Sequence, residues 1–444
     1  MKDWCEECRG RPCECYDPNA PDPEPQGLEL EGEALVAYLD SLTEEQRQEL
    51  AGPWPVRWLY PWREGEPERG INVCGGCGGG CAGLRLVLGV ELDLICVDSD
   101  ADATATAQAA GCNALRMDVC DLDPRHPALR WTRRAVFTMP CPDWSVAGKR
   151  LGLQPENIEI LIDAISDVAH VYGNVWRDGG HHGDVSTARF GEPWNDVTVA
   201  EMWSWVGELT KEKRTAGLML APVLIGMGLI AAGAPLESVI IEQAWTLPET
   251  VRGAIAIEYI VAGWNGVRWD VLDAGEFGSP SARKRAIMAA SRELLLDVVE
   301  APGITTWASD AIGWDPGTRI NTRGVRKTSG GNEFKLGRTM PGVTSKIRGW
   351  YDADDPEHRF TIEEVCLLVG LPADFPVNRS RSSRSSQCRQ LGDIFSPLVA
   401  AAVWGTLLGI EWVPFLLRYL AQQYPHVHGQ ELARSQHTPQ LLAA

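Results

Sequence analysis

The sequence predicts an α/β fold with functional residues at the carboxyl ends of its strands. Four short apolar runs, INVC, LDLICVD, RRAVFTMP and SVIIEQ, each end near a polar or glycine-rich turn, and helical patterns alternate with them. The first run leads directly into the glycine-rich stretch CGGCGGGCAG at 74–83. Because ligands of α/β sheets bind outside the carboxyl ends of the strands, we expect the chemistry of this chain there.

Length and composition are those of a globular protein with a large core. The chain has 444 residues, of which 44% are hydrophobic and 23% charged, and this excludes disorder throughout. Its first ten residues, MKDWCEECRG, contain no apolar segment, so we expect no secretory signal and a cytoplasmic location. In that reducing compartment most of the 13 cysteines are expected to be thiols.

One apolar stretch has the length of a membrane span. Residues 216–236 carry no charged side chain. Pro222 and four glycines interrupt the stretch, and the strand-like ESVIIEQ follows at once. We therefore predict a helix that the protein covers on both faces, and no contact with a membrane.

Charge is distributed unevenly along this acidic chain. The net charge is −19, but residues 316–350 hold eight basic residues against one acid, a net +7 that leaves −26 for the remainder. The basic residues are Arg319, Arg323, Arg326, Lys327, Lys335, Arg338, Lys346 and Arg348. Such a segment predicts a localised contact with a polyanion, and a solvated basic loop is the alternative.

Composition changes along the chain divide it into five parts. They are an N-terminal appendage (1–66) with a cysteine cluster, a Pro/acidic linker and an acidic helix; a main domain (67–290) with a polar insert at about 155–212; a small loop-rich domain (291–387); a C-terminal segment that completes the main domain (388–424); and a polar tail (425–444). The appendage cysteines Cys5, Cys8, Cys13 and Cys15 are either a zinc knuckle or free thiols. His181 and His182 in the insert are interpreted as loop residues.

The glycine-rich stretch predicts a nucleotide-type cofactor. Glycines allow backbone amides to approach a ligand at the start of a helix. Asp98 ends the next strand, nineteen residues after Gly79, where an acid would hold a ribose. Asp118, beyond the third strand region, is either a partner for an adenine amino group or a surface acid.

Cys141 is a candidate nucleophile. It lies between Pro140 and Pro142, directly after the strand end Val136–Thr138, so the backbone on both sides of the thiol is restrained. A buried structural cysteine is the alternative. The flanking prolines, Ser145 and Gly148 are poor core-packing partners, which favours catalysis.

These stretches together resemble a DNA (cytosine-5)-methyltransferase, and in particular the compact, tryptophan-rich type of actinobacterial phages. The family's FxGxGG motif matches residues 74–79 with Cys74 for the aromatic, and its Pro-Cys loop matches Pro140-Cys141. Its Glu-Asn-Val motif matches Glu242-Gln243-Ala244, where only the acid is retained. The similarity covers roughly residues 70–410 in the family's order.

Three later segments also follow that order. GSPSARKR matches the arginine motif, with Gly278, Pro280, Arg283 and Arg285 retained and Ser281 replacing glutamine. RTMPGVT and RFTIEEVCLLVGLPADFP resemble the end of the recognition region. QLGDIFSP resembles the final motif, with Asp393 replacing asparagine and Ser396 replacing proline.

The resemblance implies a Rossmann-like S-adenosylmethionine-dependent methyltransferase fold with a smaller, loop-rich target recognition domain. It implies a thiolate of Cys141 that adds to carbon 6 of a flipped-out cytosine, Glu242 at N3, Arg285 at O2 and Arg283 in an orienting role. S-adenosyl-L-methionine would be bound by Cys74, Gly76, Gly78, Gly79, Asp98, Asp118, Pro140 and Asp393. Double-stranded DNA would contact Ser145 and the eight basic residues.

The same resemblance implies a monomer. It would methylate DNA in the cytoplasm of a phage-infected host or within a restriction-modification system. We assign no metal to the site. Two other interpretations remain open. One is a related enzyme that acts on RNA or on a modified cytosine. The other is a catalytically silent DNA-binding homologue, suggested by the departures at Cys74, Gln243, Ser281 and Asp393.

Overall fold

The computed structural model describes residues 30–145, 148, 150–172, 197–211, 215–322, 333–377 and 382–429. Its centre is a seven-stranded sheet with the strand order β3-β2-β1-β4-β5-β7-β6, in which only β7 runs antiparallel to its neighbours. The strands are β1 (Arg69–Val73), β2 (Asp93–Asp98), β3 (Asn113–Arg116), β4 (Arg134–Phe137), β5 (Ser238–Ala244), β6 (Gly266–Asp273) and β7 (Lys284–Ser291). The predicted α/β class is confirmed.

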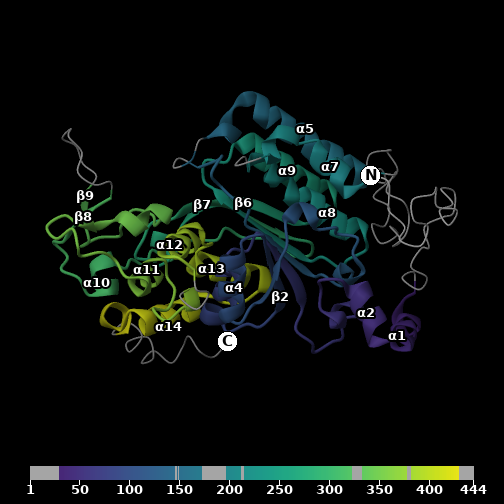
Figure 1. The fold of residues 1–444 in the computed structure, drawn as a ribbon, viewed down its shortest axis with the longest axis horizontal. Helices are drawn as coiled ribbons and strands as arrows, with labels where there is room; N and C mark the ends of the chain where they lie inside the picture. Colours follow the sequence, from purple (N-terminus) through teal and green to yellow (C-terminus); the bar gives the residue numbers. More distant parts are fainter. Residues whose placement is uncertain are drawn as a thin grey trace, which may run out of the picture.

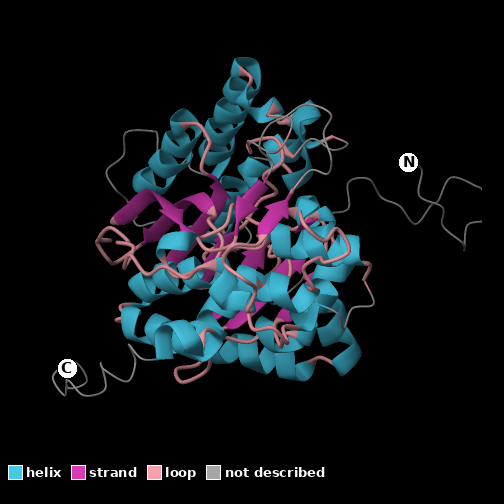
Figure 2. Cartoon of the chain, turned by 90° about the vertical axis from the view of Figure 1, so that its left-hand side faces the viewer, coloured by secondary structure: helices cyan, strands magenta, loops and turns pink. Residues whose placement is uncertain are grey.

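Helices cover both faces of the sheet, as Figure 2 shows edge-on. In Figure 1, α5, α7, α8 and α9 lie above the sheet, and α4, α13 and α14 lie below it. These helices are α3 (Gly79–Ala82), α4 (Ala101–Ala109), α5 (Pro155–Tyr172), α7 (Val199–Ser204), α8 (Ala221–Ala231), α9 (Glu249–Val261), α13 (Pro397–Leu408) and α14 (Val413–Gln423). Since both faces are covered, β1, β4 and β5 are buried along their whole length.

The apolar stretch at 216–236 is a buried helix, as predicted. Every residue of α8 is buried, and the preceding turn Ala216–Leu220 leads into it. Within the described residues, one stretch, Arg384–Leu408, is long and apolar enough to cross a membrane, and 83% of its most apolar window is buried inside the protein. Burial of that kind is what a core helix shows.

The acidic helical segment of the appendage packs against the main core. It comprises α1 (Gly32–Ser41) and α2 (Glu44–Ala51), and Thr43 and Gln46 form a capping box at the start of α2. Leu35 and Leu39 of α1 are buried in the same hydrophobic cluster as the central strands. The described part of this segment is therefore built into the body of the protein.

A second hydrophobic core lies at the end of the molecule that carries the basic segment. It is enclosed by a three-stranded sheet of order β10-β8-β9 and three helices. The elements are α10 (Ala308–Ile312), β8 (Arg319–Asn321), β9 (Glu333–Lys335), β10 (Tyr351–Asp352), α11 (Ile362–Leu368) and α12 (Arg384–Asp393). Cys77 and Ala82 of the glycine-rich region also belong to this core, so the two parts of the chain are in direct contact.

Several predicted features lie outside the described residues. They are the four appendage cysteines, His181 and His182 with residues 173–196 of the insert, Arg323, Arg326 and Lys327 of the basic segment, and residues 430–444 of the tail.

Candidate active site

The glycine-rich stretch forms a tight turn between β1 and α3. Gly76 and Gly78 have positive φ angles of 56° and 92°, and Cys74 also has a positive φ of 54°. A Cβ on Gly79 would lie 2.2 Å from the Phe395 carbonyl oxygen, whereas a Cβ on Gly76 would meet nothing within 4 Å. Glycine at 79 therefore permits close packing, while Gly76 borders open space at the carboxyl edge of the sheet.

Two carboxylates lie next to this turn. Asp98, at the end of β2, accepts hydrogen bonds from the Gly76 amide (2.9 Å) and the Asp100 amide (2.8 Å). Burial raises the pKa of Asp98, and these two amide donors oppose the rise. The exposed Asp118 accepts from the Cys120 amide at 3.0 Å.

Cys74 lies close to both carboxylates. Its pKa is raised well above the ordinary value, first by burial and then by the negative charges of Asp98 and Asp118. The turn and the side chains of Cys74, Asp98 and Asp118 lie together beside the open space at Gly76, and this edge of the sheet is the crevice in which the sequence predicts a cofactor. Backbone amides and an acid at the end of the second strand are the donor set for a nucleotide-type cofactor.

The loop that carries Cys141 is fixed at both ends. Thr138 donates to the Cys74 carbonyl oxygen at 2.7 Å, which joins the start of the loop to the glycine turn. The Trp144 and Ser145 amides both donate to the Cys141 carbonyl oxygen, at 3.1 and 2.9 Å. The buried Asp143 accepts from the Ala216 amide at 3.1 Å. The half-buried Cys141 therefore lies on a hydrogen-bonded turn that is joined to the glycine turn.

Glu242 and Arg285 lie side by side because of the strand register. Ala244 of β5 pairs with Arg285 of β7, and alternate residues of a strand share a face, so Glu242 and Arg285 are diagonal neighbours on one face. Their ion pair joins Arg285 Nε and Glu242 Oε1 at 2.7 Å, with side chains 18% and 6% exposed. Arg283, two residues earlier, donates to the Gly392 carbonyl oxygen at 2.7 Å.

These side chains form one electrostatic group. Burial raises the pKa of Cys141, the positive charges of Arg285 and Arg283 lower it, and the negative charges of Glu242 and Asp393 raise it. Burial lowers the pKa of Arg283 to about 10, and that guanidinium feels the charges of Arg285, Glu242, Cys141 and Asp393. The structure thus brings together the four residues predicted as catalytic, with Asp393 beside them.

The other predicted residues differ in exposure and in their partners. Pro140 precedes Cys141 and is half-buried, as is Ser145. The described basic residues Lys335, Arg338, Lys346 and Arg348 are exposed. Arg319 is committed to ion pairs with Glu333 (3.0 Å) and Asp354 (2.6 Å), so its charge is compensated within the protein.

The basic segment is hydrogen-bonded to the residues that immediately precede β7. The Ala282 amide donates to the Met340 carbonyl oxygen, and the Met340 amide donates to the Pro280 carbonyl oxygen, both at 2.9 Å. A Cβ on Gly392 would lie 2.4 Å from the Ser345 amide nitrogen, immediately before Lys346. Residues 345–349, which include Lys346 and Arg348, therefore pack against Gly392, whose carbonyl oxygen accepts the hydrogen bond from Arg283.

Two features of the site escaped the sequence analysis. Gln243 donates through Nε2 to the Met139 carbonyl oxygen at 3.2 Å, which ties β5 to the loop of Cys141. In the sequence, only the position of Gln243 next to Glu242 pointed to a role in the site, and the residue was interpreted as a departure from the family motif. The second feature is a group of three thiols, Cys81, Cys96 and Cys112, behind the glycine turn, whose even spacing along the chain gave no signal.

Similar folds occur among solved structures. One is the methyltransferase EhMeth of Entamoeba histolytica, with a TM-score of 0.50 and 13% identity over 78% of this chain and 98% of that chain. Another is the Dnmt2 methyltransferase of S. pombe, with a TM-score of 0.50 and 15% identity over 77% and 98%. This chain has a Rossmann-like methyltransferase fold. No family model and no curated protein matches the sequence. The comparisons therefore identify the fold and leave the reaction open.

Proposed function

We propose that this protein is an S-adenosylmethionine-dependent DNA (cytosine-5)-methyltransferase. The observation that carries the proposal is the convergence of a restrained thiol, Cys141, with the Glu242–Arg285 pair, directly beside a glycine-lined crevice. A methyltransferase fold alone supports many substrates. A nucleophilic thiol beside a carboxyl and a guanidinium is the set of groups that activation of a pyrimidine carbon requires.

The crevice fits a nucleoside sulfonium cofactor. Gly76 borders open space, Asp98 lies against the turn as a ribose partner, and the exposed Asp118 can accept from an adenine amino group. Cys74 and the backbone of Gly78 and Gly79 complete the turn. When bound, S-adenosylmethionine would supply an electrophilic methyl group.

Cys141 supplies the nucleophile. Carbon 5 of cytosine is too electron-poor to accept a methyl group unaided, and addition of the thiolate to carbon 6 makes carbon 5 an enamine-like nucleophile. The positive charges of Arg285 and Arg283 favour that thiolate against the effect of burial. After transfer, loss of the proton from carbon 5 lets the C–S bond break and releases the thiolate.

Glu242 and Arg285 manage the charge that this addition places on the ring. In this mechanism Arg285 donates to O2, where negative charge develops, and Glu242 holds a proton at N3. Their mutual ion pair keeps both groups oriented on one face of the β5–β7 ladder. Arg283, held by the Gly392 carbonyl oxygen, orients this end of the site and does not transfer a proton.

DNA is the substrate that best fits the surroundings of the site. Carbon 6 is inaccessible in a stacked duplex, so the cytosine must be flipped into the pocket. Ser345, next to the exposed Lys346, packs against Gly392, and we assign phosphate contacts with the flanking duplex to Lys346, Arg348 and Ser145. Protection of phage DNA, or a role beside a restriction enzyme, is the corresponding biological setting.

Transfer of a labelled methyl group tests the proposal. The full-length protein is incubated with S-[methyl-³H]adenosylmethionine and either a random-sequence duplex DNA or RNA of the same sequence. We expect label in DNA that is recovered as 5-methylcytosine after hydrolysis, and none with Cys141→Ser. Label in RNA alone would identify an RNA enzyme, and binding of DNA without transfer would identify a silent homologue; either result overturns the proposal.

A further inference from the structure

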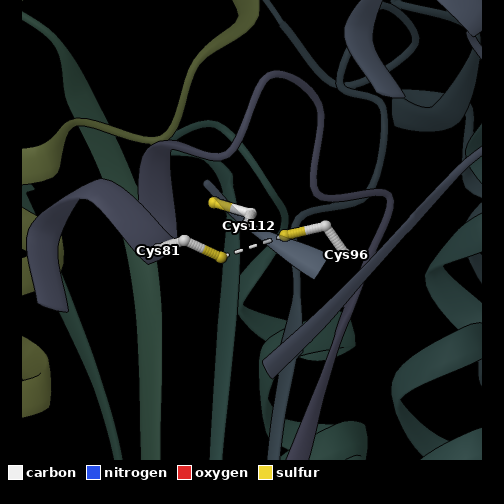
Figure 3. A group of neighbouring side chains, drawn as sticks. All are labelled: Cys81, Cys96 and Cys112. Carbon is white, nitrogen blue, oxygen red and sulfur yellow. Dashed lines mark hydrogen bonds between the residues drawn. The ribbon is translucent and has the colours of Figure 1, made fainter. Parts of the chain in front are cut away.

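Three thiols converge behind the glycine turn, on the side away from Cys141. Cys81 comes from α3, Cys96 from β2 and Cys112 from the loop before β3, and Figure 3 shows the sulfur atoms of Cys81 and Cys96 facing each other with the Cys112 side chain beside them. All three Sγ atoms lie within 4.8 Å of one another, and those of Cys81 and Cys96 are 3.0 Å apart. Three separate segments thus contribute one sulfur atom each to a single point.

The spacing of these atoms suits a soft metal ion. Zinc–thiolate bonds are about 2.3 Å long, so sulfur atoms in a tetrahedral site lie about 3.8 Å apart. The observed separations, from 3.0 Å to at most 4.8 Å, bracket that value. Side-chain rotations that move each sulfur by less than about 1 Å would therefore bring all three into coordination.

Two polar side chains lie next to the three sulfur atoms. Asn72 directs its side-chain Nδ2 at the sulfur atoms of Cys96 and Cys81, at 3.6 and 4.0 Å, while its Oδ1 is buried without a hydrogen-bond partner. The Arg85 guanidinium lies nearby, since it donates to the Ala110 carbonyl oxygen at 2.8 Å. An amide N–H group beside two of the sulfur atoms, and a guanidinium close by, can stabilise metal-bound thiolates through hydrogen bonds and charge.

The site also has an entrance. Cys81 and Cys96 are buried, but Cys112 is partly exposed. A surface cleft of about 920 Å³, on the side of the sheet edge away from the candidate active site, is lined by Cys81 and Cys112 together with Arg85, Glu91 and Asp93. An ion could reach the sulfurs from this cleft, and water in it could fill a fourth coordination position.

We propose that Cys81, Cys96 and Cys112 bind a thiophilic d¹⁰ metal ion, such as Zn²⁺, with three sulfur ligands and a fourth position open to the cleft. Binding of the metal ion does not depend on the function proposed above. A second effect rests on the function proposed above. A Cβ on Gly78 would lie 3.3 Å from Cys112 Sγ, and Asp98 is two residues beyond Cys96, so the ion would cross-link the segments that shape the crevice. Occupancy should then tighten cofactor binding.

A metal titration tests the site in the full-length chain. Cys5, Cys8, Cys13 and Cys15 are first replaced by serine, so that the appendage cannot contribute. Zn²⁺ is then titrated against a chromophoric chelator. We expect one equivalent to bind, and Cys112→Ser to weaken binding by about 100-fold or more. Cys366→Ser, at a buried thiol of the second core, is the matched control and should leave binding unchanged.

X-ray absorption on the zinc-loaded protein decides the ligands without any further variant. We expect about three sulfur neighbours at about 2.3 Å. No bound zinc, coordination by oxygen and nitrogen alone, or equal affinity of the Cys112→Ser variant would overturn the site. S-adenosylhomocysteine binding is measured with and without zinc; equal affinity overturns the coupling. No binding of that ligand under either condition counts against the proposed function and leaves the metal site standing.

Discussion

The Glu242→Gln substitution separates the chemical role of the Glu242–Arg285 pair from its structural role. Glutamine keeps the volume of the side chain but removes its charge and leaves the Arg285 guanidinium without its 2.7 Å partner. Loss of one partner from a fully buried pair costs about 3–5 kcal/mol. Because Arg285 is 18% exposed and glutamine still offers an oxygen, we expect the free energy of unfolding to fall by about 2–3 kcal/mol.

The expected effect on catalysis is larger than the effect on stability. Without a carboxyl to hold a proton at N3, the single-turnover rate of methyl transfer should fall by about 10²–10⁴-fold. Glu237→Gln is the matched control, since Glu237 pairs with Arg134 (3.1 Å) and Arg133 at the opposite end of the same strand. Glu237→Gln should lose less stability, because Arg133 and Arg134 keep Glu68 as a partner, and it should keep the parent rate.

The assay combines chemical denaturation with rapid-quench methyl transfer at saturating DNA and cofactor. If Glu242→Gln methylates at the parent rate, Glu242 takes no part in the reaction. If Glu237→Gln loses as much activity, the effect of both substitutions is only structural. Either result refutes the reasoning.

Three further predictions follow from the same geometry. Burial raises the pKa of Cys141 above that of an ordinary cysteine, which is about 8.5. The rate of its alkylation by iodoacetamide, followed by peptide mass spectrometry, should therefore still increase with pH above about 8.5. A rate that reaches a plateau near that pH would contradict this. Gly79→Ala should abolish S-adenosylhomocysteine binding in calorimetry and lower the melting temperature, whereas Gly253→Ala, where a Cβ meets nothing within 4 Å, should raise it slightly; equal behaviour of the two variants would contradict the packing argument. Arg348→Gln should reduce the salt dependence of DNA affinity by about one unit of slope, whereas Arg319→Gln, with its charge already paired, should leave it nearly unchanged; the reverse order would be inconsistent with the proposed interface.

The sequence predicts the framework well where apolar runs and glycines carry strong local signals. The strand runs that end near Asn72, Asp98, Thr138 and Glu242 lie next to one another in the sheet, as their burial on both faces requires. The β6–β7 hairpin was not predicted as a pair of strands, because its charged residues, such as Arg268 and Asp270, interrupt the apolar pattern.

The partners of individual side chains could be predicted less well. Arg319 counts as a free charge in the sequence, and only the fold shows that Glu333 and Asp354 compensate it. Gln243 appears in the sequence as a departure from a motif, yet its amide donates to the Met139 carbonyl oxygen in the loop that leads to Cys141. The thiols at 81, 96 and 112 lie far apart along the chain and meet only because α3, β2 and the loop before β3 are adjacent.

Covalent trapping tests the central claim most directly. A pool of random-sequence duplexes, with 5-fluorocytosine replacing cytosine, is incubated with the full-length protein and S-adenosylmethionine and then resolved under denaturing conditions. With fluorine in place of hydrogen, carbon 5 has no proton to lose. A thiol that has added to carbon 6 therefore stays attached after methyl transfer. We predict a stable protein–DNA adduct with the parent chain and none with Cys141→Ser. No adduct with the parent, or an equal amount with the serine variant, would contradict the account.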